Sequence, residues 1–370
     1  MPLASLSKVQ DAPPLSGDTG GASRTGTAHW LPRFVVRRAG TALLQGLAAV
    51  VLVFVVLRLL PADPATQFAG TSNPSPAELA ATRHRLGLDE SMLAQLGHFL
   101  SGLAHGDLGT SWAAGTPVGG EIAKAFPVTI QVVVLAFALT LLLAIPLGLL
   151  AASRPGSRLD AVVRVYSLFA GSQPEFWWGL LFVFVGWYKL GLFPSPLGVL
   201  SLAQTPPPDV THFVLIDALL AGDVSAWSDA LQHFALPIVT LTFALSGPFL
   251  KLVRESARKV AGSEFMVFAR ATGMPRPLLM RGLLRNSLTP VITLVGIFFA
   301  SALGGSVIIE TVFSLDGIGR YTLTSTQALD FPALQGAVVV LTACALSVYV
   351  GVDVLYALVD PRVRYGRTAA

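Results

Sequence analysis

Long apolar runs separated by short charged segments are the feature that most constrains this chain of 370 residues. Only 12% of its residues are Asp, Glu, Lys or Arg, about half the share of roughly 25% that is usual in soluble domains. A run of about 18 or more apolar residues is long enough to cross a bilayer as a helix. The pattern therefore predicts an all-α integral membrane protein and argues against an apolar soluble enzyme.

Six runs reach this length, and we interpret each as a transmembrane helix. Their predicted limits are 34–60, 127–151, 162–188, 235–254, 290–311 and 335–358. Pro146, Pro174 and Pro237 fall inside these runs, where neighbouring helices can satisfy the carbonyl groups that proline frees. The segment 1–30 is rich in Ser, Gly, Thr, Ala and Pro, which predicts a disordered tail.

The positions of Lys and Arg predict the orientation. Of the 25 such residues, 19 lie in or next to the two tails and the links after the second and fourth runs, and 6 lie in or next to the other links. Because cytoplasmic loops carry the excess of Lys and Arg, both termini are expected in the cytoplasm. The predicted division is a tail 1–30, a first helix with an extracytoplasmic segment over 31–126, a core over 127–362 with a cytoplasmic loop 255–289, and a tail 363–370.

Two of the predicted extracytoplasmic segments are long, covering 61–126 and 189–235. The first contains a helical pattern near 76–103 and the second an amphipathic piece at 213–221. These segments suit a face that meets a soluble partner, although solvated connecting loops explain them equally well.

The cytoplasmic loop predicts two short helices at an angle. Glu264 favours the N-terminal end of a helix dipole, and Ser263 can cap that helix. Gly273 followed by Pro275 ends it, and a second helix over about 277–288 leads into the fifth run. Four arginines surround these helices: Arg270, Arg276, Arg281 and Arg285. Taken alone, they could simply contact lipid headgroups.

The order Glu-x4-Ala-Arg-Ala-x-Gly over 264–273, followed by Leu-Arg-Asn-x3-Pro over 284–290, carries a more specific signal. It resembles the coupling loop of binding-protein-dependent ABC importer permeases, in particular of the dipeptide/oligopeptide branch. Phe265 departs from the general signature, which has Ala there. Further segments resemble this family in the same order along the chain: 57–64, 105–111, 145–148, 310–319 and 355–362.

The resemblance implies a type I ABC importer transmembrane fold with six helices in the bacterial plasma (inner) membrane. It also implies a second homologous permease, two ABC ATPase subunits and an extracytoplasmic substrate-binding protein as partners, besides the lipid bilayer. A di- or oligopeptide would then move inward by alternating access. Relatives of this branch carry nickel chelates, glutathione or oligosaccharides, and the sequence leaves these cargoes open. The positions that match the ATPase-docking loop are Glu264, Phe265, Ala269, Arg270, Ala271, Gly273 and Arg276.

No enzyme motif is present in the sequence. A phosphate-binding Gly-x4-Gly-Lys-Ser/Thr loop is missing, so ATP and Mg are expected on the partner ATPases and no cofactor or metal on this chain. The single cysteine, Cys344, cannot form a disulfide framework. No catalytic role and no nucleic-acid partner are expected.

Ionisable residues inside predicted spans are candidates for function, and Glu175 lies within the third run. It could meet the terminal amine of a peptide, or it could be solvated or capped beside Pro174. The other predicted pathway residues are Ser172, Gln173, Ser301 and Gly304, although small residues equally serve helix packing. An ion-coupled secondary transporter is the alternative from another class, but it would need paired buried charges and an inverted repeat, which we do not see.

Overall fold

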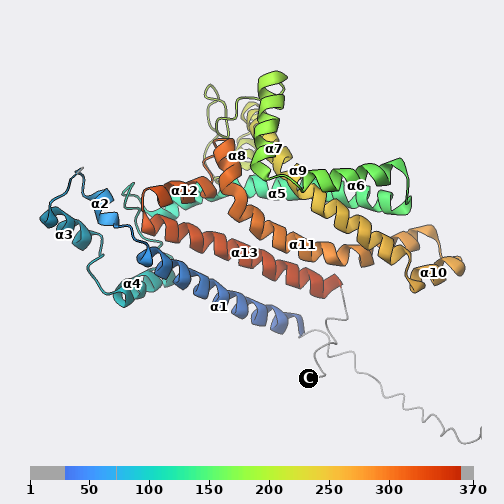
Figure 1. Ribbon diagram of the computed structural model, residues 1–370, viewed down its shortest axis with the longest axis horizontal. Coiled ribbons are helices and arrows are strands. Elements are labelled where there is room, and N and C mark those ends of the chain that lie inside the picture. Colours follow the sequence, from blue (N-terminus) through green and yellow to red (C-terminus); the bar gives the residue numbers. More distant parts are fainter. Residues whose placement is uncertain (1–29, 72, 360–370) are drawn as a thin grey trace, which may run out of the picture.

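The computed structural model describes residues 30–71 and 73–359, and the regular elements in this part are helices (Figure 1). The predicted tails 1–30 and 363–370 lie outside the described residues, except for Trp30, where the first helix begins. An all-helical fold, as predicted, is confirmed for the described part of the chain.

Five of the described helices are long and apolar enough to cross a membrane. They are α1 (Trp30–Leu59), α5 (Val118–Ser153), α9 (Val224–Ala261), α11 (Arg276–Val312) and α13 (Phe331–Val359). Each contains one predicted span or nearly all of it, and α5, α9 and α11 extend well beyond the predicted limits. Pro146 and Pro237 lie inside α5 and α9, as the sequence predicted.

Shorter helices connect the long ones. They are α2 (Pro64–Phe68), α3 (Pro76–Arg85), α4 (Met92–Ala104), α6 (Arg158–Ala170), α7 (Glu175–Phe182), the π-helix η2 (Val183–Lys189), α8 (Val214–Leu220), α10 (Glu264–Ala271) and α12 (Ile318–Gln327). The helical pattern predicted near 76–103 corresponds to α3 and α4, and the piece predicted at 213–221 corresponds to α8.

The prediction of one continuous helix over 162–188 is wrong. Helix α6 ends at Ala170, a turn follows, and α7 begins at Glu175 and passes directly into η2. Pro174 is extended (φ −61°, ψ 148°) and precedes the first turn of α7. A proline ring also disfavours helical backbone at the residue before it, so the break falls at this point. Helix α7 stands steeply to α6 (Figure 1).

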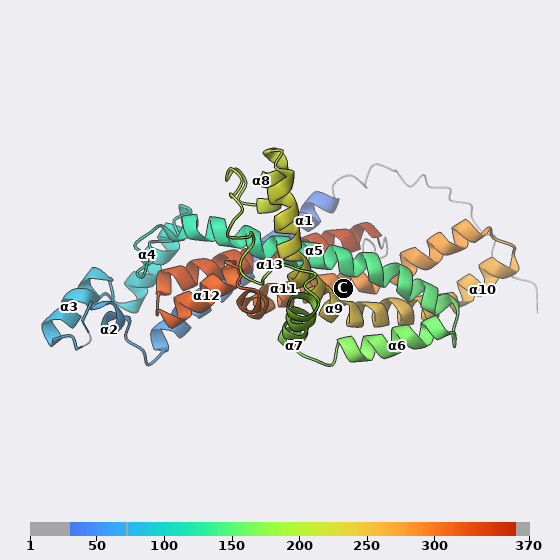
Figure 2. The same ribbon diagram turned by 90° about the horizontal axis from the view of Figure 1, so that it is seen from above.

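The core lies where α5, α9 and α11 meet. The ring of Phe137 lies 6.1 Å from that of Phe249 and 5.4 Å from that of Phe299, which joins the three helices at one point. Helices α11, α13 and α1 lie side by side in that order (Figure 1). Helix α10 lies at one end of this bundle, which we call the α10 end. Helices α2 to α4 and α12 lie toward the other, which we call the α12 end (Figure 2).

Candidate functional site

The hairpin of α10 and the first turns of α11 forms a projection at the α10 end (Figure 1). Gly273, just after α10, has φ +74°, a conformation that favours glycine. Its N–H donates to the carbonyl of Arg270 at 3.1 Å, and that of Met274 donates to the carbonyl of Ala269 at 3.0 Å. This is a Schellman ending, so the glycine stop predicted from the sequence is confirmed.

Two other local predictions for this hairpin need correction. Ser263 occupies the N-cap position of α10, but its hydroxyl donates to the carbonyl of Val260 at 2.6 Å and does not cap the helix. The helix predicted over 277–288 is not separate, because α11 runs without interruption from Arg276 to Val312.

The inner face of α10 packs against its own chain through Met266 and Ala269, which are 4% and 6% exposed. The sulfur of Met266 lies beside Gly282 of α11, 3.8 Å from where a Cβ atom would stand. Ala269 therefore does not offer its side chain to a partner in this arrangement. It was predicted as a docking position, but burial assigns it to the packing of α10.

The outer face of α10 combines an apolar centre with charged neighbours. Phe265 and Phe268 are 49% and 70% exposed, one helical turn apart. The other predicted docking residues are also exposed: Glu264, Arg270, Ala271, Gly273 and Arg276. Arg270 donates from its guanidinium to the carbonyl of Ala261 at 2.6 Å, which ties α10 to the end of α9. Phe268 was not among the predicted docking residues, although its spacing of three from Phe265 could have indicated it.

An ion pair fastens α6 to α9 between the core and the projection. Asp160 accepts a hydrogen bond of 2.5 Å from Nε of Arg254 and one of 3.0 Å from the amide of Gly156. Both bonds lower the pKa of Asp160, to about 2, and the bond from Arg254 has the larger effect. The carboxylate is therefore charged at physiological pH, and α6 is held in place beside α9.

Glu175 begins α7 and is half-buried beside α11. Its Oε2 atom lies 3.5 Å from the position a Cβ atom on Gly305 would take. Within the described part of the chain, this carboxylate forms no ion pair. The structure thus brings Glu175 to the stretch of α11 that holds the predicted pathway residues Ser301 and Gly304, both exposed.

The remaining predicted pathway residues, Ser172 and Gln173, lie in the exposed turn between α6 and α7. The Ser172 hydroxyl donates to the carbonyl of Phe169 at 2.8 Å and so satisfies a carbonyl group in the last turn of α6. These two side chains reach the surface because Pro174 breaks the helix here.

A buried carboxylate near the α12 end joins three helices, and sequence analysis gave it no role. Glu310 of α11 is 2% exposed and accepts from the hydroxyl of Thr129 on α5 at 2.5 Å and from the amide of Arg320 on α12 at 2.7 Å. Thr129 in turn accepts from the amide of Ile318 at 2.9 Å. The sequence offered one indication of this role, since Glu310 stands shortly before the Gly-x-Gly turn at 317–319.

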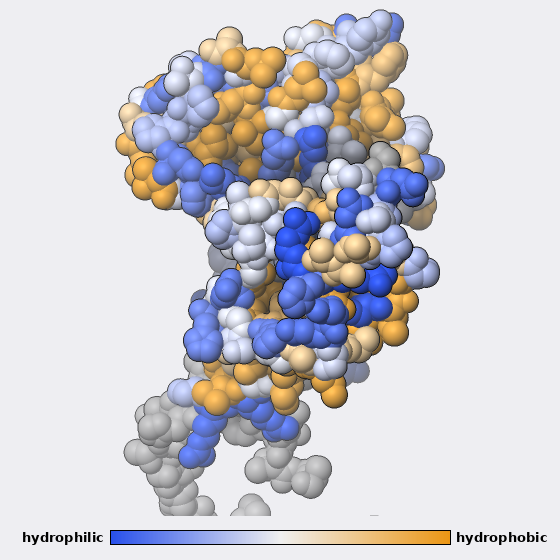
Figure 3. Space-filling view, turned by 90° about the vertical axis from the view of Figure 1, so that its left-hand side faces the viewer, coloured by the Kyte–Doolittle hydropathy of each residue, from blue (hydrophilic) through white to orange (hydrophobic). Residues whose placement is uncertain are grey.

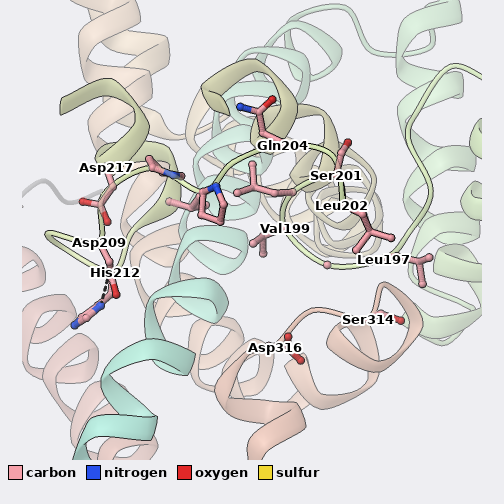
Figure 4. Close-up of a pocket in the computed structure, with 15 residues that line it drawn as sticks. Leu197, Val199, Ser201, Leu202, Gln204, Asp209, His212, Asp217, Ser314 and Asp316 are labelled. Atoms are coloured by element: carbon pink, nitrogen blue, oxygen red, sulfur yellow. Dashed lines mark hydrogen bonds and ion pairs between the residues drawn. The ribbon is translucent and has the colours of Figure 1, made fainter. Parts of the chain in front are cut away.

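A cavity of about 710 Å³ lies between the 197–217 segment and the turn after α11 (Figure 4). Asp209 and Asp217 line one side, and Asp316 stands across from them. Asp217 is buried and accepts from the amide and the hydroxyl of Thr211 at 2.8 and 2.7 Å. These three carboxylates make the lining of the cavity acidic. His212 also lines the cavity, and its Nδ1 atom lies 2.6 Å from Oδ1 of Asp209 in a hydrogen bond.

Comparison of the sequence with known protein families identifies the family of this chain. Residues 144–365 match the binding-protein-dependent transport system inner membrane component, and residues 31–144 match the N-terminal part of such membrane components. The probable D,D-dipeptide transport system permease protein DdpB of Escherichia coli K12 is 38% identical over 317 residues, which cover 85% of this chain and 93% of that protein.

Two further relatives cover 90% of this chain and 99% of their own length at 32% identity. They are the dipeptide transport system permease protein DppB of Escherichia coli K12 and the di/tripeptide transport system permease protein DppB of Pseudomonas aeruginosa UCBPP-PA14. The chain belongs to the family of binding-protein-dependent transport system inner membrane components. It is accordingly a multi-pass inner-membrane transport subunit and not an enzyme.

Proposed function

We propose that this chain is one of two homologous permease subunits of an ATP-driven importer that moves di- or oligopeptides inward. The observation that carries the proposal is the projection at the α10 end, where an exposed pair of phenylalanines is surrounded by charged residues. An apolar centre with a polar rim is typical of a protein interface. The names of the relatives favour peptides over nickel chelates, glutathione or oligosaccharides as cargo.

The proposed topology has six crossings with both termini in the cytoplasm. Five are the long helices, and the sixth is the interrupted unit of α6, α7 and η2 over 162–189, with Asp160 at its cytoplasmic edge. The excess of Lys and Arg supports this orientation, which puts the α10 end in the cytoplasm and the α12 end outside. The first helix with its external segment, 31–126, and the core, 127–362, keep the limits proposed from the sequence.

Two separate ABC ATPases would serve the pair of permeases, and the docking surface for one of them consists of the exposed residues of this projection. Its members are Glu264, Phe265, Phe268, Arg270, Ala271, Gly273 and Arg276. Ala269 contributes from inside by letting α10 lie close to its own chain. ATP and Mg would bind to the ATPases, whose movements α10 passes to α9 and α11 because it is fastened to both.

The proposed path for the peptide passes Glu175, whose carboxylate faces the small residues of α11. Ser301 and Gly304 leave room along that helix, and Ser172 and Gln173 lie at the turn before α7. On the outer side, a substrate-binding protein would deliver the peptide near the acidic cavity of Figure 4.

The proposal is tested by two changes in the projection, Glu264→Lys and Gly273→Val, in the complex purified from its own membranes and reconstituted. A β-branched residue is strained at φ +74°, so Gly273→Val should tilt α10 away from its partner. Both variants should reach the membrane at normal levels, lose uptake of a labelled dipeptide and leave ATP hydrolysis unresponsive to peptide. Gly262→Ala is the matched control, because its φ of −90° suits alanine. Normal uptake by Glu264→Lys and Gly273→Val would contradict the docking assignment.

A further inference from the structure

A second cavity, of about 660 Å³, lies between the first turns of α5, helix α12 and the turn over 111–114. Its volume falls within the roughly 300–1,000 Å³ of small-molecule sites. Seen from the α12 end, hydrophilic side chains gather across the middle of the surface, with hydrophobic ones above (Figure 3). Unlike the acidic cavity of Figure 4, this one is lined by both signs of charge: Glu121, Lys124, Asp316, Arg320 and the buried Asp330.

Two cations of this lining are available to an anionic group. Lys124 is exposed and forms no ion pair with any of the residues the structure describes. Arg320 pairs with Asp316 at 3.0 Å, but the two side chains are 42% and 88% exposed. An exposed pair of this kind is weak because water screens both charges, so a ligand carboxylate can compete for the guanidinium.

The hydroxyl of Tyr321 supports the anionic half of the lining. Its oxygen is buried in the cavity wall next to the Glu121 carboxylate. Burial and then that carboxylate raise the pKa of Tyr321, so the phenol keeps its proton and can turn it toward Glu121. Removal of the hydroxyl should therefore leave Glu121 less firmly placed for a ligand ammonium group.

The walls of the cavity are held in position by buried carboxylates. Asp330 is 1% exposed and accepts from the hydroxyl of Ser111 at 2.6 Å and from the amide of Ala113 at 3.0 Å. Glu310 accepts from the amide of Arg320 at 2.7 Å. Because these bonds fix the backbone of the walls, binding would need little reordering of that backbone.

We propose that this cavity binds a short zwitterionic peptide, with its carboxylate at Lys124 and Arg320 and its ammonium group at Glu121 and Asp316. The rest of the lining is mostly small and apolar, which suits a peptide with small side chains: Ala113, Ala114, Ala125, Val128 and Ala328. A ligand that carries both charges matches both halves of the lining. This inference rests on the proposed peptide transport and adds a binding site on the subunit itself.

The test uses the full-length protein in lipid nanodiscs, purified with the subunits that accompany it. Calorimetry measures binding of L-alanyl-L-alanine, of its C-terminal amide and of its N-acetyl form. The wild type should bind the free dipeptide about tenfold or more tighter than either blocked form, since each loses a charge-assisted contact. Lys124→Gln should weaken binding of the free dipeptide about tenfold and leave binding of the amide unchanged.

Tyr321→Phe removes only the hydroxyl and should weaken binding of the free dipeptide severalfold without lowering the melting temperature. Lys189→Gln makes the same change as Lys124→Gln at the end of η2, away from the cavity, and should bind like the wild type. Equal binding of the free and amidated dipeptide, no binding at all, or wild-type binding by Lys124→Gln overturns the inference.

Uptake measurements separate this inference from the proposed function. If the wild-type complex imports the dipeptide but Lys124→Gln shows the same concentration dependence of uptake, the cavity is not a peptide site and the transport proposal stands. If the wild-type complex imports no peptide, the transport proposal itself fails.

Discussion

Replacing Gly319 by alanine tests how closely α12 is seated on α11. A Cβ atom on Gly319 would stand 2.6 Å from the amide nitrogen of Val307 and 2.7 Å from Oγ of Ser306. The first distance is about 0.8 Å inside the 3.4 Å at which ordinary van der Waals contact begins. Because that neighbour is backbone, it cannot rotate away, and α12 must move off α11.

The expected magnitude follows from two opposing effects. Overpacking a closely packed site costs about 1–3 kcal/mol in the free energy of unfolding. Alanine is the better helix former by about 1 kcal/mol, which offsets part of this cost. An overlap of this size with backbone places the cost in the upper part of that range, so a net loss of about 1–2 kcal/mol remains. For a chain of 370 residues this loss should lower the melting temperature by about 1–3 °C.

Tryptophan fluorescence during heating of the detergent-solubilised protein measures this change. Gly351→Ala in α13 is the matched control, because a Cβ atom there meets nothing within 4 Å. It should melt at the wild-type temperature or slightly above. If Gly319→Ala melts with the wild type, or if Gly351→Ala loses as much stability, the close seating of α12 is refuted.

Three further predictions concern the ion pair, the projection and the path. Asp160 has a folded pKa of about 2 against 3.8 when unperturbed, so its stabilising effect is complete above about pH 4 and is lost as the pH falls toward 2. Melting temperatures between pH 5 and 2.5 should therefore fall more steeply for the wild type than for Asp160→Asn, and parallel curves would contradict this. Ala269→Leu should lower the melting temperature because the site is buried, whereas the exposed Ala271→Leu should keep it and weaken co-purification of the ATPases. If both leucine variants melt alike, the assignment of the two faces of α10 is wrong. Glu175→Gln should reduce uptake of a zwitterionic dipeptide at normal protein levels, and unchanged uptake would remove Glu175 from the path.

Local residue chemistry was enough to predict much of the projection. Gly273 ends α10 as expected, because a left-handed turn favours glycine and the following Pro275 cannot continue the helix. Ser263 had the right position for a cap, yet its hydroxyl prefers the carbonyl of Val260. The choice between these partners depends on how the end of α9 is placed, which the local sequence does not specify.

For Glu175 and the proposed peptide path, the local sequence predicted less and the tertiary structure decided more. Glu175 was a candidate because a carboxylate in an apolar run is costly, but its position beside Gly305 follows from the break at Pro174. The sequence predicted an uninterrupted helix here, since a proline is often tolerated inside a membrane helix. Pro146 and Pro237 are tolerated in that way, and Pro174 is not.

Apolar run length, the placement of Lys and Arg and the glycine stop were sufficient to predict a helical membrane protein with a projecting hairpin, because each acts over a few neighbouring residues. The tertiary structure alone decided that Ala269 faces inward, that Glu310 joins α5, α11 and α12, and that Lys124, Arg320 and Tyr321 line one cavity. These groups come from segments up to about two hundred residues apart, and only the packing of the helices brings them together.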